Sequence, residues 1–278
     1  MMEKHLHDSI CQTVQAVKED QPLVPSITNT VTINLVANTQ LAAGGSAAMV
    51  YLPDEGEAMA QAGEALYINM GTIFPIYEET LPRTVAKLNA TQTPWVLDPV
   101  AVGMGTSRSQ LLLKMREAKP AVIKGNASEI IAMAQLWELL ETDQVVASKG
   151  VDSLHTTQEA RQAALSLARH TGGAVVVSGE TDLVTDGTRL ITSTGGSQLM
   201  THITGAGCAL GGLIAVYATK ADPLTAALTG VNAFNYAGSK AEKQAQGPAS
   251  FQVHLLDELY QASPDDIAGL AIQIEKVD

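Results

Sequence analysis

Cysteine, aromatic residues and basic residues are all scarce in this 278-residue sequence. The two cysteines, Cys11 and Cys208, lie far apart and form no CxxC pair, which excludes a disulfide framework and fits a reducing cytoplasm. Aromatic residues make up only 4% of the chain, so its core must be built from Ala, Val, Leu and Ile. Such a core is typical of parallel sheets covered by Ala-rich helices.

Positive charge is also in short supply, with 17 basic against 29 acidic residues and a net charge of −12. No basic stripe is present, so we expect no nucleic-acid partner. A polyanion such as ATP would have to be held locally, by a helix end, a metal ion and a few cations. Neither an apolar signal core near the N-terminus nor a run of membrane-spanning length occurs, so we expect a cytoplasmic protein with no membrane partner.

Short apolar runs that end in Gly or polar residues alternate with segments rich in Ala, Leu and Glu. This alternation predicts an α/β fold with a parallel sheet and a site at the carboxyl ends of its strands. Neither a linker nor a repeat is visible, so residues 1–278 are expected to form one domain, with residues 1–20 a helical or loosely ordered lead-in. The expected strands cover 65–70, 94–100, 121–124, 145–148 and 174–178, and the clearest helices 128–141 and 157–171.

The most informative stretch is the Gly-rich segment 201–212, which runs into an apolar segment. A Gly-rich turn that opens a helix leaves backbone N–H groups unpaired at the positive end of the helix dipole, which favours an anion. The segment is not a P-loop, because no Gly-Lys-Ser/Thr follows, and its late position excludes a Rossmann fingerprint. Cys208 lies on the same turn, so the segment indicates phosphoryl transfer with a reactive side chain nearby, and a helix N-terminus would lower the pKa of that thiol.

Polar residues follow two of the expected strands. Asp98 ends one of them and is a candidate for orienting Mg²⁺ on phosphates, or else a cap. Asn126 and Glu129 are spaced as in a capping box, and Glu129 is also a candidate for a Mg²⁺–water cluster. Lys124 is either a point charge for a phosphate or a solvated lysine. Nearer the N-terminus, Asn29 precedes the helix-like run 31–41 as a cap or ligand residue.

Taken together, these segments resemble the hydroxyethylthiazole kinase family of the ribokinase-like superfamily. The resemblance covers about residues 20–262, and its most specific elements are Asn-Ala-Ser-Glu at 126–129 and Thr-Gly-Ala-Gly-Cys at 204–208. Most of the superfamily has Asp where Cys208 stands, so the cysteine points to the thiazole kinases. Further matching segments are 22–24, 27–29, 37–38, 44–49, 97–103, 122–125, 179–180, 247–251 and 255–260.

This resemblance implies a three-layer sandwich whose mostly parallel central sheet has helices on both faces. It also implies ATP- and Mg²⁺-dependent phosphorylation of the hydroxyl of 4-methyl-5-(2-hydroxyethyl)thiazole in thiamine salvage, by a homotrimer with sites at subunit interfaces. The implied substrate contacts are Met49 and Gly205, and the metal-side residues are Asp98 and Glu129. For ATP the implied residues are Lys124, Ser178, Asn29 and Thr204. The implied anion hole is formed by Gly205, Ala206, Gly207 and Cys208, with Cys208 beside the substrate hydroxyl as the catalytic candidate.

The sequence departs from the family pattern at three places. Lys124 replaces the usual Arg, so a compact ammonium takes the place of a planar guanidinium. Ser178 replaces the usual Thr. Ala47 and Ala48 stand where a Ser-Pro pair usually precedes Met49. These departures leave open a kinase for another small alcohol, such as the aminopyrimidine, or a catalytically weak thiazole- or nucleotide-binding sensor. An NAD(P)H-hydrate dehydratase is disfavoured, because that enzyme has Asp at the position of Cys208.

Overall fold

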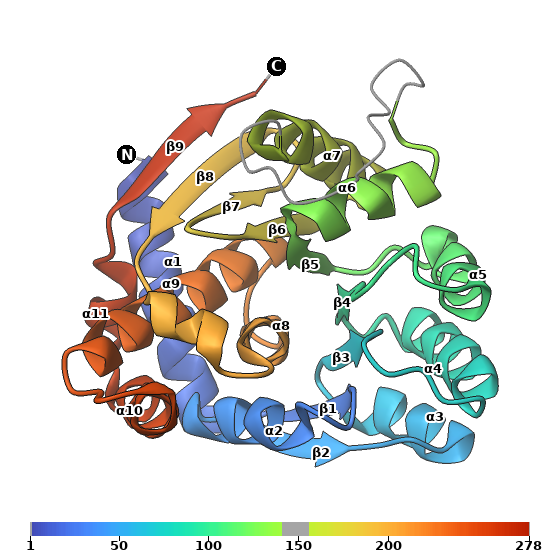
Figure 1. Ribbon diagram of the computed structural model, residues 1–278, viewed down its shortest axis with the longest axis horizontal. Helices are drawn as coiled ribbons and strands as arrows, with labels where there is room; N and C mark the ends of the chain where they lie inside the picture. The colour runs from blue at the N-terminus through green and yellow to red at the C-terminus, as the bar shows by residue number, and fades with distance from the viewer. Residues whose placement is uncertain (1, 141–155, 278) are drawn as a thin grey trace.

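A computed structural model describes residues 2–140 and 156–277 of the chain (Figure 1). Within these residues, nine strands form a single sheet in the order β2-β1-β3-β4-β5-β6-β7-β8-β9. The strands from β2 to β6 in this order pair in parallel, and β7, β8 and β9 extend the sheet in antiparallel fashion. The expected strand at 145–148 lies outside the described residues.

Four of the parallel strands, β3 to β6, match the expected runs at 65–70, 94–100, 121–124 and 174–178, whereas β1 and β2 were not among these expected strands. The bounds of the parallel strands are β1 Leu23–Ile27, β2 Ser46–Met49, β3 Leu66–Asn69, β4 Trp95–Asp98, β5 Val122–Asn126 and β6 Ala174–Ser178. The antiparallel extension, which we did not predict, consists of β7 Thr181–Thr185, β8 Arg189–Thr194 and β9 Ile272–Lys276.

One layer of helices covers one face of the sheet and carries the longest apolar segments (Figure 1). Small residues bring α8 close to the strands: a Cβ added at Gly211 would lie 2.5 Å from the Tyr67 ring, and one at Gly212 would lie 2.8 Å from Val36. The glycines therefore set the depth of α8 against β3 and α2. The helices of this layer are α1 Met2–Asp20, α2 Ile33–Ala42, α8 Ala206–Tyr217, α9 Pro223–Glu242, α10 Pro248–Gln261 and α11 Pro264–Ala268.

The second layer packs on the opposite face around Trp95, Leu97 and Trp137, all buried. Its helix α6 ends at Leu136 and does not continue to residue 140 as expected, since Glu138 adopts a left-handed φ of 57° that stops a helix. The layer consists of α3 Pro53–Ala62, α4 Tyr77–Thr91, α5 Thr106–Lys114, α6 Ala127–Leu136 and α7 Thr156–Thr171, with the 3-10 turn η1 at Arg116–Ala118.

The expected three-layer sandwich with a mostly parallel sheet is therefore confirmed. Of the two alternatives for the lead-in, the helix is correct, since α1 begins at Met2. Between β8 and the Gly-rich turn the chain forms the 3-10 turn η3 at Gln198–His202. No helix in residues 2–140 and 156–277 combines the length and the apolarity that crossing a bilayer requires.

Candidate active site

The Gly-rich turn opens α8 as expected. Gly205 is the N-cap residue, and its φ of 92° lies in the region that favours glycine. Its carbonyl accepts the first helical hydrogen bond from Ala209 N–H at 2.8 Å. Ala206 N–H already donates to Ile203 O at a long 3.5 Å, so the N–H groups of Gly207 and Cys208 are the better placed to receive an anion.

Lys124 reaches the start of α8 from β5. A Cβ added at Gly207 would lie 3.2 Å from Lys124 Nζ, which places the ammonium beside the first turn of the helix. Only 3% of this lysine is exposed, so the solvated alternative is wrong. A fixed cation next to unpaired helix N–H groups makes this corner of the sheet attractive to a phosphate.

Asp98 faces the same corner from β4 and is completely buried. Its Oδ2 accepts hydrogen bonds from Tyr67 OH at 2.8 Å and Asn69 Nδ2 at 3.1 Å, and Lys124 Nζ lies 3.5 Å away. Its Oδ1 has no hydrogen-bond partner. A buried carboxylate oxygen without a partner is costly unless a ligand or a cation satisfies it.

Burial and charge set the protonation of this pair. Burial raises the pKa of Asp98 to about 6, against the lowering effect of Lys124, and the charge of Glu129 adds to the rise. Burial lowers the pKa of Lys124, but the negative charges of Asp98 and Glu129 outweigh burial and leave that pKa raised. At neutral pH the site therefore contains a lysine cation paired with a carboxylate.

Two asparagines connect this pair to Cys208. Asn29 Nδ2 donates to Asn69 Oδ1 at 2.9 Å and lies 3.5 Å from Cys208 Sγ. Asn29 Oδ1 accepts from the N–H groups of Val31 and Thr32, both at 3.2 Å, and so orders the turn before α2. Asn29 thus orders the turn before α2, whose N-cap residue is Thr32, and its amide also faces Cys208. Asn69 joins it to the carboxylate.

The structure overturns the expectation of an acidic thiol at Cys208. Burial raises the pKa of Cys208, and the neighbouring charge of Asp98 raises it further, which outweighs the opposing charge of Lys124. Cys208 therefore keeps its proton at neutral pH and is not placed to act as a strong base.

Glu129 forms the expected capping box with Asn126. Its Oε2 accepts from Asn126 N–H at 2.9 Å, while Asn126 Oδ1 accepts from Glu129 N–H at 2.9 Å. Its Oε1 lies 3.4 Å from Ala101 N, in the loop after β4. Ser178 pairs with Asn126 in the sheet register, and its hydroxyl donates to Gly125 O at 3.3 Å. These residues share the strand ends next to Lys124.

Thr204 and Met49 complete the set of expected site residues. Thr204 is exposed on the turn just before α8. Met49 ends the edge strand β2, where it pairs in register with Ser26 and is partly buried against the same core as Cys208. Two residues that the sequence reading missed, Tyr67 and Asn69, are both hydrogen-bonded to Asp98.

Oxygen donors on two neighbouring strand ends fit a Mg²⁺ ion. The free Oδ1 of Asp98 is the donor available without breaking a hydrogen bond, and Glu129 lies close enough for its charge to raise the pKa of Asp98. Hard oxygen donors of this kind suit Mg²⁺, which keeps several of its waters.

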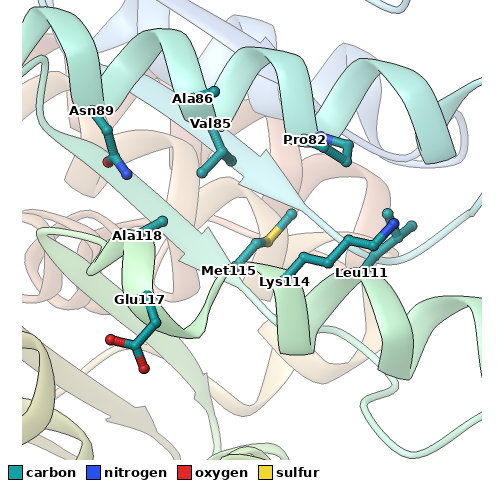
Figure 2. Close-up of a pocket in the computed structure, with 9 residues that line it drawn as sticks. All are labelled: Pro82, Val85, Ala86, Asn89, Leu111, Lys114, Met115, Glu117 and Ala118. Carbon is teal, nitrogen blue, oxygen red and sulfur yellow. The ribbon is translucent and has the colours of Figure 1, made fainter.

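Two surface cavities lie outside this set of residues. One, of about 260 Å³, lies between the later part of α4 and the end of α5 with η1, lined by residues such as Val85, Leu111 and Met115 (Figure 2). Because these segments lead back to the amino ends of the strands, that cavity is on the side away from the site. The other, of about 390 Å³, lies between the loops after β3 and β4, where Phe74, Met104 and Arg108 line it.

Known proteins share both this fold and this arrangement of segments. The model of the hydroxyethylthiazole kinase family matches residues 14–265. The hydroxyethylthiazole kinase of Bifidobacterium longum (strain DJO10A) is 44% identical over 97% of this chain and 92% of its own. The solved structure of a hydroxyethylthiazole kinase protein from Pyrococcus horikoshii OT3 superposes with a TM-score of 0.84 at 29% identity, covering 97% of this chain and 99% of its own.

A pyridoxal kinase from Staphylococcus aureus, solved with ADP, shares only the fold, with a TM-score of 0.58 at 18% identity over 79% of this chain and 88% of its own. Fold and site together define a kinase of the ribokinase-like class. Within that class, the chain belongs to the hydroxyethylthiazole kinase family.

Proposed function

We propose that the protein transfers the γ-phosphoryl group of ATP to the hydroxyl of 4-methyl-5-(2-hydroxyethyl)thiazole, a step of thiamine salvage. The observation that carries the proposal is the meeting of the α8 N-terminus, the buried Lys124 cation and the partner-free Asp98 oxygen at one corner of the sheet. The relatives named as hydroxyethylthiazole kinases support the choice of alcohol.

Positioning and charge neutralisation supply most of the acceleration in phosphoryl transfer, because the transition state is loose. The N–H groups of Gly207 and Cys208 would hold the transferred phosphoryl group, while Gly205 and Ala206 form the backbone that aims them. Lys124, held beside Gly207, would add a fixed positive charge without having to reorganise. Asp98, itself held by hydrogen bonds from Tyr67 and Asn69, would keep the Lys124 ammonium from moving into solvent.

Asp98 and Glu129 would hold Mg²⁺, which, when bound, neutralises charge on the phosphate oxygens. ATP would extend from the α8 turn across the ends of β5 and β6. On that path Ser178 and Thr204 would contact the nucleotide, and Asn29 would contact its phosphate end or the metal region. The ADP in the pyridoxal kinase structure shows that a protein of this fold binds an adenine nucleotide, which supports ATP as the phosphate donor.

The thiazole would lie between Met49 and Gly205, with its hydroxyl beside Cys208. Met49 offers a soft and adaptable apolar contact for a sulfur-containing ring. The protonated Cys208 thiol would shape this end of the site and donate a weak hydrogen bond. The alcohol would lose its proton late, after most of the charge has moved, so a strong base is not required.

We further propose that residues 1–278 act as one domain, that three copies assemble with sites at their interfaces, and that the protein works in the cytoplasm. The trimer is supported by the edge position of β2, which bears Met49, and by Val31, which is 70% exposed just before α2. Both features would be covered by a neighbouring copy. Two unpaired thiols, Cys11 and Cys208, suit a reducing compartment.

The proposal is tested by ATP consumption in the presence of Mg²⁺ and one alcohol at a time. The thiazole alcohol, the aminopyrimidine alcohol and pyridoxal form the panel, and Asp98→Asn is the matched variant, because it keeps the shape of the side chain. We expect ATP consumption that requires the thiazole alcohol and falls sharply in Asp98→Asn. Consumption with another member of the panel only would reassign the substrate, and thiazole binding without consumption would indicate the sensor.

A further inference from the structure

A second group of reactive side chains joins α1 to α11, apart from the strand ends that carry the proposed kinase site (Figure 1). His7 and Cys11 lie on α1, and Asp265 lies on α11. Cys11 Sγ lies 3.9 Å from His7 Nδ1 and 3.7 Å from Asp265 Oδ1. All three ligand atoms lie within 4.8 Å of one another.

Local structure explains why these side chains converge. His7 and Cys11 are four residues apart on a helix, so they project from the same face of α1. Asp265 lies in the first turn of α11, which is fixed by the capping box between Ser263 and Asp266. The carboxylate of Asp266 accepts the hydrogen bonds of that capping box, whereas the carboxylate of Asp265 faces Cys11.

The two helices are also held in place by contacts outside the cluster. Lys18 Nζ, near the end of α1, donates to Ala262 O at 2.6 Å in the connection that leads to α11. Ile10 and Ile267 are both buried in the core beneath the two helices. Packing therefore fixes the two helix backbones that carry the three side chains, and no metal is needed to bring the helices together.

The spacing is close to what a tetrahedral zinc ion requires. Zinc–sulfur bonds of about 2.3 Å and zinc–nitrogen or zinc–oxygen bonds of about 2.0 Å at a tetrahedral angle put the ligand atoms about 3.5 Å apart. The observed 3.9 and 3.7 Å from Cys11 Sγ would need only a small contraction, and the His7–Asp265 separation, which is within 4.8 Å, would need one of up to about 1.3 Å. Thiolate and imidazole donors favour zinc over Mg²⁺ or Ca²⁺. A thiolate and a carboxylate would also balance the charge of the ion.

We propose that His7, Cys11 and Asp265 bind one Zn²⁺ ion, with a water molecule as the fourth ligand. On binding, the Cys11 S–H bond breaks, a sulfur–zinc bond forms, and the proton passes to solvent. Asp8, whose Oδ1 lies 3.7 Å from His7 Nδ1, adds negative charge beside the ion. The ion would fasten α1 to α11, so the site would stabilise the fold without taking part in the reaction.

The test uses the full-length, metal-free protein and Co²⁺ as a spectroscopic substitute for zinc. A thiolate bound to Co²⁺ gives a charge-transfer absorption that oxygen and nitrogen ligands do not give. We expect this band to saturate at one equivalent of Co²⁺ and to disappear when Zn²⁺ is added. Zn²⁺ at one hundred times its dissociation constant should also stabilise the fold by about 2.7 kcal/mol, as mass action requires.

Matched variants locate the ion. Cys11→Ser and Asp265→Asn should abolish the one-equivalent band or weaken Co²⁺ binding, and both should lose the rise in melting temperature with Zn²⁺. His5→Ala, on an exposed part of α1, and Cys208→Ser, at the strand ends, should keep both effects. Absence of the band in the unsubstituted protein would overturn the proposal. So would a band that survives in Cys11→Ser and disappears in Cys208→Ser. If the melting temperatures of the metal-free variants lie near that of the metal-free unsubstituted protein, the variants are folded.

Discussion

Replacement of Lys124 by methionine removes the charge that faces Asp98 and keeps most of the length of the side chain. Both residues are buried, at 3% and 0% exposure. Removing one partner of a buried ion pair costs about 3–5 kcal/mol, because the other charge is left without compensation. Asp98 can avoid this cost by taking up a proton, which from its pKa of about 6 costs about 1.4 kcal/mol at pH 7, at about 1.4 kcal/mol per pH unit. We therefore expect Lys124→Met to lose about 1–2 kcal/mol at pH 7 and about 3 kcal/mol at pH 8.

The pH dependence of this loss identifies its cause. Burial raises the pKa of Asp98 from its ordinary value of 3.8 to about 6. Between pH 3.8 and pH 6 the native protein therefore binds a proton that the unfolded chain has lost. The contribution of Asp98 to stability consequently falls as the pH rises through this window. Loss of Lys124 raises the pKa of Asp98 further, so the fall in stability continues above pH 6. The penalty of Lys124→Met should be small at pH 5.5 and largest at pH 8.

The assay is thermal or urea unfolding of the two proteins at both pH values. At pH 8 the melting temperature of Lys124→Met should be lower by roughly 10 °C, given about 2–4 °C per kcal/mol for a chain of this size. The control is the double variant Asp98→Asn/Lys124→Met, which leaves no buried charge in this pair and should be less sensitive to pH. Equal penalties at pH 5.5 and pH 8 would refute the electrostatic reasoning, as would a double variant as unstable as the single one at pH 8.

Substitutions at three further residues test the site. Cys208→Ala should lower kcat by less than about tenfold, since losing a general base costs about 10²–10⁴-fold, and a larger loss with ATP and thiazole binding intact would assign the thiol a catalytic role. Gly205→Ala should unfold more readily in urea than Gly103→Ala: both glycines have a positive φ, 92° and 86°, but only the new Cβ at Gly205 would meet a side chain, Thr32 at 2.5 Å. Similar losses in the two variants would show that this contact is unimportant. Glu129→Gln should keep the capping box and change stability by no more than about 0.5 kcal/mol, while its KM for Mg²⁺-ATP rises; Glu129→Ala should lose about 1 kcal/mol as well. An unchanged KM in Glu129→Gln would remove Glu129 from the metal site.

Most of the parallel strands could be predicted, because each of these strands carries a signal in its own stretch of sequence. Apolar runs such as 174–178 end at Gly or polar residues, and helical segments separate them. The β7–β8 extension carries a local signal that we overlooked, since Asp186-Gly187 between two β-rich runs is a hairpin sequence. Gly187 has a φ of 88° in the loop that joins the two strands, a backbone conformation that glycine adopts readily.

The site was harder to predict because its chemistry depends on contacts between distant segments. Asp98 was found as a polar residue at a strand end, but its partner Asn69 follows from the pairing of β3 with β4. The pKa of Cys208 could not be read from the helix terminus alone, because burial and the charge of Asp98, at the end of β4, both raise it. Lys124 is buried for the same reason: the end of β5 meets α8 only in the folded chain.

The most direct test of the proposed reaction uses ATP whose γ-phosphoryl oxygens carry ¹⁸O, with Mg²⁺ and 4-methyl-5-(2-hydroxyethyl)thiazole. The product is weighed by mass spectrometry. Our account predicts a thiazole monophosphate that contains the labelled γ-phosphoryl group, formed only when the protein is present. Absence of labelled thiazole phosphate, from a protein that binds both the thiazole alcohol and ATP, would contradict it.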